Sequence, residues 1–165
     1  MLSNRRLLHH TMPLRSEGTT QVRSNRSALE EALSYHSALL DSLAAHQGQV
    51  WTPSPRLFTR GFVSPAHLSH TAWESASQTG ALAHMQYATV LRLSRLYAQQ
   101  DRYAEQTRSI AQILYSELYR GGPGAVVSNH RNLAAIIGTF RYRERQLLGV
   151  YDENLAALAP SRGAR

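Results

Sequence analysis

The sequence contains no cysteine and no lysine. The absence of cysteine excludes disulfides, thiolate zinc sites, iron–sulfur clusters and cysteine nucleophiles. It leaves the redox compartment undetermined, because a cysteine-free protein is compatible with both oxidising and reducing compartments. All 18 basic residues are therefore arginines, a bias that we attribute to the codon usage of a GC-rich bacterial genome. The chain of 165 residues is 42% apolar, which is enough for one hydrophobic core without a stabilising metal.

Long apolar runs are also missing. The longest, Leu133 to Gly138, is far shorter than the roughly 18 to 20 residues that a transmembrane helix needs. Residues Met1 to Leu8 are too few and too charged for the apolar region of a signal peptide. We therefore expect the chain as written to be soluble.

Positive charge is concentrated at the start of the chain. Of the formal net charge of +7, residues 1–26 carry +4, because five arginines there face a single acid, Glu17. We expect residues 1–24 to be a disordered basic tail or the product of a misplaced translation start. Residues 25–159 should form a single helical-bundle domain, and residues 160–165 a disordered C-terminus.

Apolar residues recur at helical spacing through the rest of the chain, which predicts an all-α fold. The predicted helices span about 27–47, 65–79, 85–119 and 128–158. The first begins at a capping box of Ser27 and Glu30, and the third is expected to continue through Asp101. Two long helices joined by the glycine-rich turn 121–124 should lie antiparallel. The predicted architecture is an elongated antiparallel bundle of three long helices plus one short helix.

The last helix carries its apolar residues at alternating spacings of four and three, as helices that pack together do. This seam consists of Leu133, Ile137, Phe140, Glu144, Leu147, Tyr151, Asn154 and Leu158. We expect Leu39, Ile113, Ile137 and Phe140 to be almost inaccessible to solvent. A lone carboxylate in such a seam would cost several kcal/mol, so Glu144 should pair with an arginine or reach the end of the bundle.

Aromatic side chains between the long helices are predicted to be structural anchors. Residues 48–64 contain prolines and glycines that exclude a long helix, yet they carry too many large apolar groups for a free linker. We expect this loop to pack along the bundle as a lid, with Trp51 and Phe58 as anchors. Trp73 should anchor the short helix, with Thr71 as its cap.

Four segments carry a family resemblance: VRSNRSALEEALSYHSALLDSL at 22–43, TAWESASQTGAL at 71–82, LSRLYAQQDRY at 93–103 and RERQLLGVYDENL at 143–155. Over about residues 20–158 the chain resembles a family of small bacterial helical proteins without an assigned activity. Its members have an N-terminal membrane anchor followed by a helical domain outside the cytoplasm. The anchor is not present in this chain, so the resemblance implies a replaced or shortened start and a place at the periplasmic face of the inner membrane.

One trio of side chains has metal-binding character. On a helix, His67, His70 and Glu74 would share one face, and two imidazoles with a carboxylate could hold zinc with an open coordination position. Eight histidines make such a trio common by chance, its spacing is not that of the His-Glu-x-x-His motif, and a fourth ligand is not recognisable. We predict no metal and no cofactor.

Arginines alternate with aromatic residues in the last helix. Arg141, Arg143 and Arg145 interleave with Phe140 and Tyr142, as on surfaces that stack bases and bind phosphates. Successive helical residues point about 100° apart, however, so only Arg141 and Arg145 share a face. This geometry disfavours nucleic-acid binding.

Three functions remain open. The favoured one is a non-catalytic helical interaction or structural module that binds a protein partner or self-associates, and that touches a membrane only through the missing anchor. The second is non-specific binding of nucleic acid or an anionic surface through arginines. The third is a ligand-binding or metal-dependent bundle that uses His67, His70 and Glu74. We expect no enzyme, because paired acids, a nucleophile with its base and a phosphate-binding loop are all missing.

Overall fold

The structure, a computed structural model, describes residues 4–45, 60–61, 63–128 and 130–159. Within these residues the fold is all-α and contains no strand, as predicted. The helices are α1 (Asn4–Ala45), α2 (Thr71–Gln78), the short 3₁₀ helix η2 (Ala81–His84), α3 (Tyr87–Ser128) and α4 (His130–Leu158). No helix among the described residues combines the length and the hydropathy needed to cross a lipid bilayer.

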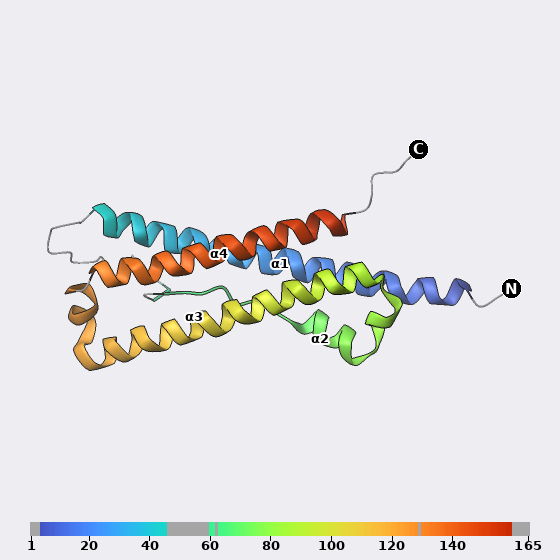
Figure 1. The fold of residues 1–165 in the computed structure, drawn as a ribbon, viewed down its shortest axis with the longest axis horizontal. Coiled ribbons are helices and arrows are strands. Elements are labelled where there is room, and N and C mark those ends of the chain that lie inside the picture. Colours follow the sequence, from blue (N-terminus) through green and yellow to red (C-terminus); the bar gives the residue numbers. More distant parts are fainter. Residues whose placement is uncertain (1–3, 46–59, 62, 129, 160–165) are drawn as a thin grey trace.

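Helix α4 packs against both α1 and α3. Figure 1 shows the three long helices lying along one another, with α1 and α3 running in one direction and α4 in the other. Helix α2 and η2 lie at one end, where they connect to the start of α3. A segment without helical structure leads into α2 and runs between α3 and the pair formed by α1 and α4.

Each long helix buries one residue in every three or four along a single stripe, which is the heptad pattern of helices that supercoil around each other. The buried stripe of α1 is Val22, Asn25, Leu29, Ala32, His36, Leu39 and Leu43. That of α4 is the predicted seam from Leu133 to Asn154. In α3 the stripe includes Leu96, Gln100, Tyr103, Thr107 and Leu114. The prediction of buried Leu39, Ile137 and Phe140 is confirmed, at 1%, 0% and 0% exposure.

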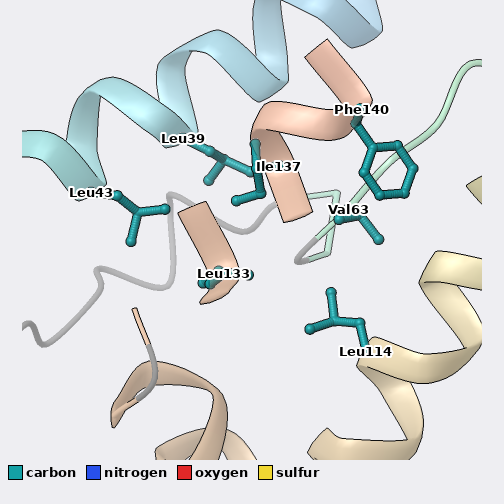
Figure 2. Packing of buried hydrophobic residues seen from close by; sticks show 7 residues of the cluster. All are labelled: Leu39, Leu43, Val63, Leu114, Leu133, Ile137 and Phe140. Carbon is teal, nitrogen blue, oxygen red and sulfur yellow. The ribbon is translucent and has the colours of Figure 1, made fainter. Parts of the chain in front are cut away.

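The apolar part of this core lies in two clusters. Figure 2 shows one of them, in which side chains from α1, α3 and α4 point toward a common centre together with Val63 of the non-helical segment. The second cluster lies further along the helices and includes Val22, Leu29, Leu96 and Tyr151. Polar residues of the stripes, His36 and Glu144 among them, are as deeply buried as the apolar ones.

The predicted start of the first helix near Ser27 is wrong. Helix α1 begins at Asn4, so residues 4–24, which were predicted to form a tail, are helical. Val22 is 1% exposed and belongs to the second core cluster. The stripe continues upstream through Asn25, a polar residue whose burial the apolar pattern did not reveal.

The predicted helix over 65–79 is also too long. Helix α2 begins at Thr71, with His70 rather than Thr71 at the N-cap position and no side-chain cap. The following Gly80 has φ 73°, a left-handed conformation that glycine adopts without strain and that ends the helix as predicted. Trp73 is half-buried and stacks on Tyr97 with ring centroids 5.2 Å apart. Trp51 and Phe58, with most of the predicted lid, lie outside the described residues.

Helix α3 is continuous through Asp101, as predicted. It bends at Gly122, where φ is 67° and ψ is 180°, and then resumes as far as Ser128. The expected burial of Ile113 is wrong, since 64% of it is exposed. The buried stripe passes through Thr107 and Leu114, so Ile113 lies on the outer side of the helix.

Candidate functional site

The non-helical segment 63–70, which we call the strap, is the centre of the candidate site. It runs along the three long helices (Figure 1). Val63 and Leu68 of the strap are buried in the two apolar clusters. Backbone groups of an irregular segment have no partners of their own, so burying them is costly unless other groups bind them. Side chains of α1 and α3 supply these partners.

Two buried side chains meet on one oxygen of a buried carboxylate. His36 Nδ1 of α1 lies 2.8 Å from Glu144 Oε1 of α4, and the Tyr103 hydroxyl of α3 donates to the same oxygen at 3.2 Å. His36 and Glu144 are 0% exposed and Tyr103 is 4% exposed. Burial and the nearby Glu144 carboxylate raise the pKa of Tyr103 far above its usual value, so its hydroxyl remains a donor.

The same cluster holds two amides of the strap. The Ser64 N–H donates to His36 Nε2 at 3.2 Å, and the Ala66 N–H donates to the Tyr103 hydroxyl at 3.0 Å. Because Nε2 accepts, the ring proton of a neutral His36 lies on Nδ1 and points to Glu144. His36 and Tyr103 thus bind alternate amides of the strap while Glu144 orients both. We call this arrangement the histidine clamp.

A second cluster, the amide clamp, binds the strap further along. The Asn25 side chain pairs with both backbone groups of Ser69: its Oδ1 accepts the N–H at 2.9 Å and its Nδ2 donates to the C=O at 2.8 Å. Gln100 Nε2 donates to the same carbonyl at 3.1 Å. The Tyr151 hydroxyl donates to Gln100 Oε1 at 2.6 Å and fixes the orientation of that amide. Burial raises the pKa of Tyr151 well above its usual value, which keeps this donor protonated.

Two further side chains of α1 bind the ends of the same region. The Tyr35 hydroxyl donates to the backbone carbonyl of Gly61. Gln21 Oε1 accepts the Ala72 N–H at 2.7 Å and so supplies a partner for a free amide in the first turn of α2. The part of α1 that precedes its predicted start at Ser27 therefore supplies two side chains, Gln21 and Asn25, that bind the strap and the start of α2.

The chemistry available at the histidine clamp is limited by its burial. A histidine beside a carboxylate is a common general-base pair, but such a base must come within hydrogen-bond reach of a substrate proton. Here both nitrogens of His36 are occupied and both residues are fully buried. Glu144 Oε2 has no hydrogen-bond partner among the described residues. In this conformation the clamp binds the chain's own backbone.

The structure does not place the three weak metal candidates on one helical face. His67 and His70 precede α2, so they do not share a helical face with Glu74. His70 Nδ1 lies 3.5 Å from Asp101 Oδ1, and its ring packs against Tyr97. Across the residues that the structure describes, no group of three histidine, aspartate or glutamate side chains could hold a metal ion.

The arginine candidates of α4 have different surroundings. Arg143 is half-buried and donates to Gln106 of α3, while its Nε atom is buried without a partner in the described part of the chain. Arg141 is half-buried and Arg145 is exposed. Glu144 pairs with His36, which corrects the expected arginine partner or position at the bundle end.

Sequence reasoning recognised Glu144 as an unusual seam residue but missed its partners. His36 and Asn25 are not among the site residues predicted from the sequence, and Asn25 lies inside the predicted domain of residues 25–159 but before its predicted first helix. The available signal was polar residues at heptad positions on all three long helices, such as Asn25, Gln100 and Glu144. A comparison of the chain with protein-family models, curated proteins and solved structures finds no match.

Proposed function

We propose that this protein is a non-catalytic helical interaction or structural module, built as an elongated antiparallel bundle of three long helices with one short helix. The observation that carries this proposal is that the buried polar side chains form hydrogen bonds within the bundle and to its own backbone. The side chains with most catalytic character, His36, Glu144 and Tyr103, lie inside the bundle and bind its own strap. With the strap in place, His36 and Glu144 are 0% exposed and Tyr103 is 4% exposed.

The exposed residues support a role in surface contact. Tyr87, Ile113 and Tyr142 are 80%, 64% and 65% exposed, and these large apolar side chains stand on the outer sides of α3 and α4. Tyrosine and the other aromatic residues are enriched in protein interfaces. We therefore propose a protein partner or a second copy of this chain as the binding partner. In keeping with the family that the sequence resembles, we place the module on the outer side of the inner membrane.

Sedimentation velocity over a range of concentrations tests the self-association form of this proposal. Self-association should give a mass that rises with concentration, and Ile113→Arg should weaken it without changing the melting temperature. Ser109→Arg, which places the same charge at another exposed position of α3, is the matched control. A concentration-independent monomer would exclude self-association and leave only a different protein as the partner.

Zinc tests the metal-dependent alternative. A ligand that binds only the folded state raises the melting temperature. Because the proposed module does not bind metal, zinc at modest excess should leave its melting temperature unchanged. A rise that disappears when His67 and His70 are both changed to alanine would contradict the proposal and support a metal site.

A further inference from the structure

The histidine clamp contains one group whose hydrogen-bonding role reverses when it takes up a proton. His36 Nε2 accepts the Ser64 N–H at 3.2 Å, while Nδ1 donates to Glu144 Oε1 at 2.8 Å. A second ring proton would turn Nε2 into a donor that faces the Ser64 donor. The same proton would place a positive charge beside the Glu144 carboxylate and strengthen that contact.

We propose that proton uptake by His36 releases the strap at Ser64 and converts the His36–Glu144 hydrogen bond into an ion pair. The histidine clamp is then a latch that is closed when His36 is neutral and open when it is charged. Two arrangements of the same side chain, one bound to the strap and one bound only to Glu144, give the latch its two states. This inference does not depend on the partner or on the function proposed above.

The groups around His36 fit such a change. From α4 it is faced by the Glu144 carboxylate and by the Phe140 ring, whose centroid lies 5.2 Å from the imidazole. From α3 the Tyr103 hydroxyl contacts the same carboxylate oxygen, and from α1 itself the Tyr35 ring packs edge-on against the imidazole with the ring centroids 5.6 Å apart. In the part of the chain described, no arginine forms an ion pair with Glu144. A charged His36 would therefore meet an anion and no competing cation.

The strap should open locally. Ala66 is held by Tyr103, whose pKa burial raises, so this contact does not titrate together with histidines. Ser69 is held by the amides of Asn25 and Gln100, neither of which titrates. Release should thus begin at Ser64 and leave the amide clamp closed.

Nuclear magnetic resonance on the full chain can test both halves of the inference. Side-chain ¹⁵N shifts report how many protons the His36 ring carries between about pH 8 and about pH 5, the range in which histidines ordinarily titrate. Amide exchange, corrected for its intrinsic pH dependence, reports the release of each strap amide. As His36 becomes charged, the protection of Ser64 should fall about two- to tenfold, the factor that corresponds to one ordinary hydrogen bond. The protection of Ser69 should not change.

His36→Gln is the matched variant, because glutamine can donate to Glu144 and accept from Ser64 but cannot gain a proton in this range. In this variant the Ser64 amide should remain protected at acidic pH. If the variant fails to fold, the comparison of Ser64 with Ser69 in the unchanged chain still decides the question.

Three results would overturn the inference. The first is a His36 ring that keeps a single proton throughout this pH range. The second is equal loss of protection at Ser64 and Ser69, which indicates loosening of the whole bundle. The third is the same acid response in His36→Gln, which would assign the effect to another group.

Discussion

His36 and Glu144 are separated by 108 residues in the sequence, yet their side chains lie 2.8 Å apart at zero exposure between the first and last helices. Glu144 Oε1 accepts from both His36 and Tyr103. Through these two residues a single carboxylate orients contacts to two amides of the strap. The pair therefore links the packing of α1 and α4 to the position of the strap.

Replacing Glu144 should be costly in proportion to the contacts that are lost. Glu144→Ala leaves two buried donors without an acceptor, and it should lower the free energy of unfolding by about 3–5 kcal/mol. Glu144→Gln keeps a carbonyl acceptor and should cost clearly less. Urea denaturation followed by circular dichroism measures both. Glu153→Gln, at an exposed position of the same helix, should stay within about 0.5 kcal/mol of the unchanged chain. Equal losses for the alanine variant and this control would mean that the cluster has no energetic role.

Truncation of Phe140 should test the apolar core of α4. Phe140 is 0% exposed and packs in the first cluster, so Phe140→Ala should lower the free energy of unfolding by roughly 3–5 kcal/mol. Ile113→Ala removes an exposed side chain of α3 and should change it by about 0.5 kcal/mol or less. Thermal and urea denaturation of both variants give the comparison. Similar losses at the two positions would contradict the described faces of α3 and α4.

The amide clamp gives a prediction about backbone recognition. Asn25→Ala leaves the partly buried N–H of Ser69 without its partner, which should destabilise the fold by about 1–3 kcal/mol. Amide exchange at Ser69 should rise together with this loss. Asn132→Ala, at an exposed position of α4, should have neither effect. A protected Ser69 amide in Asn25→Ala would show that another group holds it.

Alkaline pH should destabilise the fold through its buried tyrosines. Burial raises the pKa of Tyr97 from its ordinary 10.0 to about 12, so the folded state favours the protonated phenol. The stabilisation that comes from this preference is complete below about pH 10, where the phenol is protonated in both the folded and the unfolded state. It is lost as the pH rises from 10 toward 12. Denaturation at several alkaline pH values should show the decline. Tyr97→Phe keeps the ring against Trp73 and should reduce the slope. An unchanged slope in this variant would remove Tyr97 from the explanation.

The sequence predicted the apolar architecture well because heptad spacing is a local property. The buried stripe of α4 from Leu133 to Asn154 follows directly from alternating spacings of four and three. The expected burial of Ile113 was wrong for a related reason. In α3 the stripe passes through the polar residues Gln100 and Thr107, and an assignment based on apolar residues alone shifts it to the wrong side.

The strap could not be predicted in the same way. Ser64 and Pro65 resemble a helix start, and local signals favour a helix from this point. Their actual conformation depends on His36, Tyr103 and Asn25, which bind the strap backbone from distant parts of the chain. Such contacts leave no periodic pattern in the strap itself. Recognising them requires knowing that polar residues at buried heptad positions need partners across the bundle.

The packing of α1 against α4 has a consequence for synthesis on the ribosome. The partner of the first long helix is the last one to be translated, so the buried stripe of α1 has no α4 to cover it while the middle of the chain emerges. Exposed apolar surface on a partly made chain favours aggregation and binding by chaperones. The strap and α3 are made before α4, and only then can Glu144 reach His36. A nascent chain that stalls before α4 would hold most of its helices without the carboxylate that joins them.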